Sequence, residues 1–250
     1  MVDGTILEQL APTEPVERAS AGEGGVFITF EGGEGTGKST HIRFLSEALR
    51  KRGLEVVCVR EPGGTSIGEE LRQVVLNCNN RNMADDCELL IYEAARAQIV
   101  QETIRPALSR GAVVLCDRFA DSTVAYQAYG RGLSLDLVRA CNHIACRGLK
   151  PDRTILMVAP GGAEQGLERA TRRFGADRLE MEDLSFHERV VEGFARIQEQ
   201  EPERVRKVVS DDQRSVTARG VFAALADLFP WMQELLDDSS SFDSLDRGRP

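Results

Sequence analysis

Features that mark membrane, secreted or nucleic-acid-binding proteins are missing from this sequence of 250 residues. No apolar run approaches the roughly 18 residues that a membrane span needs, and the N-terminus lacks the basic-then-apolar pattern of a signal peptide. The six cysteines form no C-x-x-C pair, and the net charge is −9. We therefore expect a cytoplasmic protein with reduced thiols, no membrane contact and no nucleic-acid partner.

Length and composition allow one domain with a substantial core. Hydrophobic residues make up 42% of the chain and charged residues 28%, which is typical of a globular protein. The polar residues 1–24 show no periodic pattern, so we expect a flexible N-terminal extension. The acidic, serine-rich residues 237–250 predict a disordered tail. The domain is expected between them, over residues 25–236.

One glycine-rich segment fits the phosphate-binding pattern G-x-x-x-x-G-K-[ST] without a mismatch, from Gly32 to Ser39. An apolar strand over 26–30 precedes it and a helix over 39–52 follows, which is the context that a P-loop requires. Its backbone N–H groups and the helix N-terminus would hold phosphate oxygens. Lys38 can reach the outer phosphates, and the Ser39 hydroxyl can bind Mg²⁺. The predicted ATP-binding residues are Gly32, Gly33, Glu34, Gly35, Thr36, Gly37, Lys38, Ser39 and Thr40.

Five apolar segments alternate with amphipathic helices, which predicts an α/β fold. The expected strands are 26–30, 56–59, 112–116, 154–158 and 205–209. This alternation favours a five-stranded parallel sheet with helices on both faces, a three-layer α/β/α arrangement. Ligands bind beyond the carboxyl ends of such strands. The P-loop, the turn from Glu61 to Thr65 and the pair Asp117-Arg118 should therefore meet at one edge.

Asp117 directly follows the third predicted strand, where an acidic residue in P-loop enzymes holds Mg²⁺. Arg118 next to it offers a planar fork of donors to phosphate. The alternative for Arg118 is a simple ion pair with Asp117. Glu61 and Pro62 leave the second strand in a tight turn, which we expect to be strained, with a cis peptide bond as one form of that strain.

Two helices carry aromatic and polar residues that could recognise a base. Tyr92 and Arg96 are four residues apart and share a helix face. They could stack on a base and hydrogen-bond to it, or they could form a core edge with a surface partner. Tyr126 and Gln127 raise the same two possibilities on another helix.

Arginines crowd the segment between two later helices, at positions 169, 172, 173 and 178. Such a cluster is often a solvated surface. In an acidic chain, next to Gly175, it also fits a short mobile lid over residues 169–180 that brings arginines to a transferring phosphoryl group.

These residues together resemble the bacterial thymidylate kinase family, a group of P-loop nucleoside monophosphate kinases. The resemblance covers about residues 26–230. It rests on the segment from Phe30 to Thr40, Arg60 to Thr65, Tyr92 to Arg96, Asp117 to Gln127, Gly130 to Gly132, and Asp177 to Glu180. It implies transfer of the γ-phosphoryl group of ATP to dTMP, with Mg²⁺, in a homodimer.

The resemblance also implies roles for individual residues. Tyr92 matches the aromatic that stacks on thymine, Arg96, Thr123 and Gln127 match base-contacting positions, and Tyr126 matches the residue that crowds the sugar 2′ position. The substrate-binding set is Glu34, Glu61, Pro62, Tyr92, Arg96, Arg118, Thr123, Tyr126 and Gln127. The catalytic set is Lys38, Arg118, Arg169 and Arg173, with Ser39 and Asp117 at the metal.

Other functions remain open from the residues alone. The phosphoryl acceptor could be a deoxynucleoside or a different monophosphate. A nucleotide-dependent switch would be expected to carry an Asn/Thr-Lys-x-Asp motif, which is not in the sequence. A binding module without catalysis is disfavoured by the intact Lys38, Ser39 and Asp117.

Overall fold

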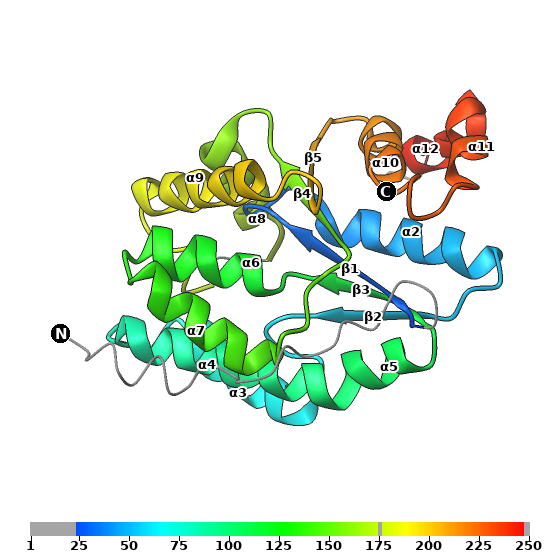
Figure 1. The fold of residues 1–250 in the computed structure, drawn as a ribbon. Helices are drawn as coiled ribbons and strands as arrows, with labels where there is room; N and C mark the ends of the chain where they lie inside the picture. The colour runs from blue at the N-terminus through cyan, green and yellow to red at the C-terminus, as the bar shows by residue number, and fades with distance from the viewer. Residues whose placement is uncertain (1–23, 175–176, 248–250) are drawn as a thin grey trace.

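The structure is a computed structural model that describes residues 24–174 and 177–247. Nearly all of the expected N-terminal extension therefore lies outside the described residues. The five strands form one parallel sheet in the order β2-β3-β1-β4-β5 (Figure 1), as predicted. They are β1 Val26–Glu31, β2 Val56–Arg60, β3 Val113–Asp117, β4 Arg153–Val158 and β5 Val205–Val209.

Helices connect the strands and cover the sheet. In the first half of the chain they are α2 Lys38–Lys51, α3 Ser66–Leu76, α4 Asp85–Ile99, α5 Arg105–Ser109, α6 Ala120–Thr123 and α7 Leu135–Cys146. They continue with α8 Gly162–Phe174, α9 Leu184–Gln200, α10 Arg214–Ala223, α11 Met232–Asp237 and α12 Ser244–Arg247. A 3₁₀ turn, η3 Ser239–Phe242, joins α11 to α12. None of the described helices combines the length and the apolar character needed to cross a lipid bilayer.

Alternate side chains of the strands point to opposite faces, and each face has its own core. Ile28 and Phe30 of β1 pack with Leu45 of α2 and Phe222 of α10. Phe27, which directly precedes Ile28 in β1, faces the other way and packs in the core that the long helix from α4 to α5 covers. This alternation gives the predicted three layers, because every parallel strand must bury both of its faces.

The register of the sheet aligns the ends of three strands. Asp117 at the end of β3 lies level with Phe30 of β1 and with Arg60 of β2. The P-loop, the turn after β2 and the turn after β3 consequently leave the sheet at one edge, as the sequence predicted.

Two helices contain a wider, π-helical turn. The apolar pattern of residues 85–105 predicts one long helix, which begins with α4 and continues through η1 Val100–Ile104 into α5, with Pro106 in the first turn of α5. Proline has no N–H to donate to the carbonyl four residues earlier. In a π-turn the backbone hydrogen bonds span five residues instead of four. The second π-segment, η2 Val124–Gly130, follows α6 and carries Tyr126 and Gln127.

The C-terminal segment only partly follows its sequence pattern. The pattern after Ser215 predicts a last helix that reaches about Leu236 with a disturbance at Pro230, and the structure divides this stretch into α10 and α11. The expected disordered tail is wrong for its described part, because Phe242 is 1% exposed and packs against Phe44 and Phe222. Phe242 and Leu245 are apolar residues three positions apart, and their burial outweighs the acidic, serine-rich composition around them.

Candidate active site

The P-loop joins β1 to α2 in the conformation that its glycines permit. Gly32, Gly35 and Gly37 have positive φ angles of 122°, 65° and 87°. Residues with a side chain rarely adopt this backbone conformation. A Cβ at Gly35 would lie 2.1 Å from the carbonyl oxygen of Gly166 in α8, so glycine at this position also allows the close approach of α8. The Lys38 ammonium reaches back across the loop and donates to the carbonyls of Gly32 (3.2 Å) and Gly33 (2.9 Å).

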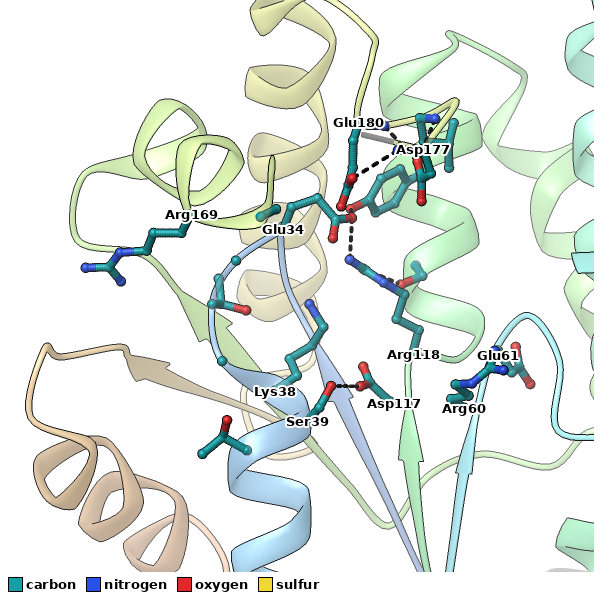
Figure 2. Close-up of a pocket in the computed structure, with 18 of the residues that line it drawn as sticks. Glu34, Lys38, Ser39, Arg60, Glu61, Asp117, Arg118, Arg169, Asp177 and Glu180 are labelled. Carbon is teal, nitrogen blue, oxygen red and sulfur yellow. Dashed lines mark hydrogen bonds and ion pairs between the residues drawn. The ribbon is translucent and has the colours of Figure 1, made fainter. Parts of the chain in front are cut away.

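A cleft of about 970 Å³ opens beside the P-loop (Figure 2). It lies at the carboxyl ends of the strands, with α8 along one side. The cleft brings together these predicted residues: Glu34, Gly35, Thr36, Gly37, Lys38, Ser39, Thr40, Glu61, Pro62, Tyr92, Arg96, Asp117, Arg118, Thr123, Tyr126, Gln127 and Arg169. Gly32 and Gly33 instead line a separate cavity of about 220 Å³ behind the loop. The side chain of Arg173 lies outside the described residues.

Ser39 and Asp117 supply two hard oxygen ligands in one place. The Ser39 hydroxyl donates to Asp117 Oδ2 at 2.8 Å, and Ser39 is exposed to the cleft. Mg²⁺ is held by one or two such groups together with phosphate and water, so this donor set fits it. In the part of the chain that the structure describes, no group of three or more His, Cys, Asp or Glu could hold a metal.

Arg118, Glu34 and Tyr126 form a compact network above the P-loop. Arg118 Nη2 lies 2.5 Å from Glu34 Oε1, and the Tyr126 hydroxyl donates to the same oxygen at 2.7 Å. The carboxylate partner of Arg118 is therefore Glu34, and the simple pair with Asp117 considered above is wrong. Burial disfavours the charge on Glu34, but Arg118, Lys38 and the Tyr126 hydroxyl outweigh burial and lower the pKa of Glu34 to about 2.

The backbone of Arg118 is also unusual. Its φ of 71° lies in the left-handed region, which non-glycine residues rarely adopt. This conformation turns the guanidinium over the P-loop, where Nη1 donates to the Gly32 carbonyl at 2.9 Å. Figure 2 shows Arg118 pointing between Lys38 and Glu34.

Arg96 is a buried hub at the floor of the cleft. It is 1% exposed, and its guanidinium contacts the carboxylates of Glu61 and Glu93 at 2.8 Å each, the hydroxyl of Thr123 at 2.7 Å and the amide oxygen of Asn142 at 2.9 Å. The partners are buried or partly buried, so the alternative of a surface partner is wrong. Nε and one Nη2 hydrogen bond to Glu61, and Nη1 bonds to the other three partners. One Nη2 hydrogen of the five N–H donors is therefore left for a ligand.

The Glu61 carboxyl beneath this arginine is strongly perturbed. Burial raises its pKa to about 7, although Arg96 opposes that shift. Its Oε1 atom is buried and has no hydrogen-bond partner among the described residues. The Glu61–Pro62 peptide bond is cis, as the sequence suggested for this turn.

Tyr92 and Gln127 complete the end of the cleft away from the P-loop. Tyr92 on α4 is half-buried and lines the cleft, and burial raises its pKa, so the phenol is neutral. Gln127 on η2 is 1% exposed and donates through Nε2 to Glu88 at 2.8 Å. Tyr126, next to it in the chain, holds its ring over the Arg118 guanidinium, 5.1 Å from Cζ to the ring centroid.

The segment predicted as a lid has two different ends. Arg169 on α8 pairs with Asp212 at 2.8 Å, and its guanidinium points away from Lys38 (Figure 2). Arg178 is buried and donates to Glu88 at 2.5 Å and to the Val75 carbonyl at 2.8 Å. The prediction of a solvated or phosphate-facing cluster is therefore wrong for Arg178, because α3 and α4 supply buried acceptors that sequence spacing does not show.

Several cleft residues had no predicted role. Arg60 and Arg72 both donate to the Pro62 carbonyl, at 3.1 Å and 2.9 Å, and line the cleft. Ser210 and Asp211 line it beyond β5. Arg60 and Ser210 stand at strand ends, so the rule that selected Asp117 could have found both. Arg72 lies within a helix, and no local signal distinguishes it.

Comparisons with known proteins agree with this geometry. A family model described as thymidylate kinase matches residues 30–218. A thymidylate kinase of Geobacter sulfurreducens is 45% identical over 212 residues, which cover 82% of this chain and 99% of that protein. A thymidylate kinase of Alcanivorax borkumensis is 49% identical over 184 residues, covering 74% and 88%.

Solved structures point in the same direction. The crystal structure of thymidylate kinase from Ehrlichia chaffeensis matches with a TM-score of 0.66 and 30% identity, over 81% of this chain and 98% of that one. The expected P-loop, the five-stranded parallel sheet and the sequence matches all lead to one assignment. The chain belongs to the thymidylate kinase family, whose members phosphorylate dTMP to dTDP with ATP.

Proposed function

We propose that the two ends of the cleft divide the work of this phosphoryl transfer, with ATP at the P-loop and dTMP beside Arg118. The observation that supports this division is the network of Arg118, Glu34 and Tyr126, which stands between Lys38 and the base-binding helices. Phosphoryl transfer needs positioned reactants and positive charge at the transferring group, more than covalent chemistry by the protein.

At the donor end, the backbone of residues 32–40 would hold the ATP phosphates. Lys38 now donates to two loop carbonyls, and those weak contacts can be exchanged for charge-assisted bonds to phosphate oxygens. The Ser39 hydroxyl and Asp117 would hold Mg²⁺. When bound, Mg²⁺ neutralises charge on the phosphates of ATP.

At the acceptor end, Arg118 would contact the phosphate of dTMP and hold it in line with ATP. Tyr92 would stack on thymine, and the remaining Nη2 hydrogen of Arg96 would donate to a carbonyl of the base. Thr123 and Gln127 would meet the polar edge of the base. Glu61 and Pro62 would close the side of this pocket. The ring of Tyr126, itself 4% exposed, would exclude a 2′-hydroxyl by its bulk.

The lid would supply the remaining positive charge. Arg169 must exchange Asp212 for a phosphate oxygen, which is inexpensive because Asp212 is 85% exposed and such surface pairs are weak. Arg173 lies one turn further along α8 and would act with it. Closure of α8 over ATP would also exclude water from the transfer.

We also propose that the chain acts as a homodimer in the cytoplasm. Helices α3 and α4 pack together and expose Ile67, Val74 and Leu90, at 52%, 45% and 59%. Exposed apolar residues on adjacent helices favour an interface with a second copy. All six cysteines are free thiols, which fits a reducing compartment.

A coupled assay of ADP release tests the proposed acceptor. The panel is dTMP, dUMP, dCMP, dGMP and thymidine, with Lys38→Ala as the inactive control. We expect the highest kcat/KM for dTMP and almost no turnover in the control. Faster turnover of thymidine than of dTMP would overturn the assignment of Arg118 to an acceptor phosphate.

A further inference from the structure

Glu88 on α4 is a buried carboxylate whose hydrogen-bonding capacity is filled. It is 1% exposed. Oε1 accepts from Gln127 Nε2 at 2.8 Å and from Arg131 Nε at 3.2 Å. Oε2 accepts from Arg131 Nη2 at 3.0 Å and from Arg178 Nη2 at 2.5 Å. Two arginines and one amide therefore surround a single carboxylate beneath the acceptor end of the cleft.

The two arginines keep this carboxylate charged and in place. Burial opposes ionisation of Glu88, but the bonds from Arg131, Gln127 and Arg178 outweigh it and lower the pKa of Glu88. Arg178 is itself anchored, because its Nε donates to the Val75 carbonyl and its backbone N–H to the Leu76 carbonyl. Glu88 consequently presents acceptors only, in a fixed position.

A fixed acceptor determines which end of the Gln127 amide faces it. Only the NH₂ group of Gln127 can lie 2.8 Å from an ionised carboxylate oxygen, since the amide oxygen would meet it acceptor against acceptor. The amide oxygen Oε1 must therefore point away from Glu88. Gln127 lines the cleft, so Oε1 is the polar atom that this side chain can offer to a bound base.

We propose that Glu88 is a positioning residue for base specificity, which fixes the Gln127 amide so that the acceptor site selects a pyrimidine with a hydrogen on N3. This inference rests on the proposed contact between Gln127 and the base. Thymine and uracil carry that hydrogen and can donate it to Oε1. Cytosine has an unprotonated N3, which would place two acceptors opposite each other.

An amide held less firmly would lose this selection. If Gln127 could rotate by half a turn, Nε2 would donate to cytosine N3 and the site would accept both bases. In this protein that rotation breaks the bond to Glu88 and turns Oε1 toward a buried carboxylate, which carries a large cost. The selectivity is thus set by a residue that need not touch the nucleotide.

The test compares kcat/KM for dTMP and dCMP in Glu88→Gln. The new amide at position 88 can either accept from Gln127 or donate to it, so both orientations of Gln127 become available. We expect the dTMP to dCMP ratio of kcat/KM to fall by roughly tenfold or more, the size of effect of a mispaired buried group. A general loss of stability would lower both activities and leave their ratio unchanged.

Two further variants separate the possible causes. Arg131→Gln removes a neighbouring charge but keeps the bond between Glu88 and Gln127, so the ratio should stay within about twofold of the wild type. The double variant Glu88→Gln with Arg178→Gln removes one charge of each sign and should reproduce the fall in the ratio. It provides the measurement if the single variant does not fold.

Gln127→Met tests the proposed contact on which the inference rests. If this variant lowers the ratio while Glu88→Gln and the double variant leave it unchanged, Gln127 reads the base but Glu88 does not orient it, and the inference is wrong. If Gln127→Met leaves the ratio unchanged, the base contact of Gln127 is wrong and the inference falls with it. An equal fall in Arg131→Gln would indicate a general disturbance and would also overturn the inference.

Discussion

The Ser39 hydroxyl lies 2.8 Å from the Asp117 carboxylate, although 78 positions separate the two residues in the chain. Ser39 lies at the start of α2, just after the P-loop that follows β1, and Asp117 ends β3. The two residues lie close together because β1 and β3 are paired in the sheet. This contact is the basis of the proposed Mg²⁺ site, and it leads to the first prediction.

Asp117→Asn should raise the Mg²⁺ concentration needed for half-maximal activity by roughly tenfold or more, because an amide is a weaker ligand than a carboxylate. The fold should persist, since Asp117 lies at a partly exposed strand end. The measurement is a Mg²⁺ titration of kcat at saturating ATP and dTMP, with Ser39→Ala alongside. An unchanged Mg²⁺ dependence in both variants would remove these residues from the metal site.

Arg173→Ala should lower kcat by roughly 10³-fold, with a much smaller effect on KM for dTMP, as expected for a charge used mainly in the transition state. Arg169→Ala should also lower kcat, and Arg172→Ala serves as the matched control with a far smaller effect. Steady-state kinetics of the three variants tests the lid. Near-normal kcat in all three would make Arg118 the remaining candidate for this role.

Tyr126→Ala should narrow the preference for dTMP over its ribonucleotide counterpart, since the buried ring would no longer occupy the space of a 2′-hydroxyl. Tyr126→Phe is the matched control, because it removes only the hydroxyl that donates to Glu34 and should keep the preference. The quantity to compare is the deoxy to ribo ratio of kcat/KM. Equal ratios in all three proteins would assign the discrimination to other residues.

Glu31→Gln should make the protein more stable at high pH relative to the wild type. Burial, followed by the charge of Asp121, raises the pKa of Glu31 from 4.5 to about 7. Between these two values the folded protein holds a proton that the unfolded chain has released, so rising pH favours unfolding in this window. Glutamine stays neutral and can still accept from the backbone N–H groups of Phe119 and Ser122.

Denaturant titrations at pH 4.5 and pH 8 measure this effect. The stability of Glu31→Gln relative to the wild type should increase by up to about 3 kcal/mol from the lower to the higher pH. A difference that does not change with pH would show that Glu31 is ionised in the fold across this range.

Phe242→Ala should reduce the free energy of unfolding by roughly 3 kcal/mol, because it leaves a cavity between Phe44 and Phe222. Phe242→Leu, which conserves most of the volume, should cost less than about 1.5 kcal/mol. Chemical denaturation gives both values. Identical stability of all three proteins would show that Phe242 does not pack in the core, and the original expectation of a disordered tail would then hold.

Much of the fold could be predicted because its signals are local. The P-loop occupies consecutive residues, and its glycines are needed where φ is positive, at Gly32, Gly35 and Gly37. The strands are short apolar runs, and the β5 bounds of Val205–Val209 agree with the prediction. Residues at strand ends, such as Asp117, reach the cleft whatever the rest of the chain does, because parallel strands end at one edge.

The sequence by itself therefore determined the sheet, the phosphate-binding loop and most residues of the cleft, while the tertiary structure decided which side chain meets which. Arg118 pairs with Glu34 instead of its neighbour Asp117, and Arg178 is buried on Glu88 instead of facing the phosphates. Phe242 packs in the core, although its neighbours in the sequence are polar. These choices depend on which groups of opposite charge or apolar character lie within contact distance after folding, and spacing along the chain carries no information about that distance.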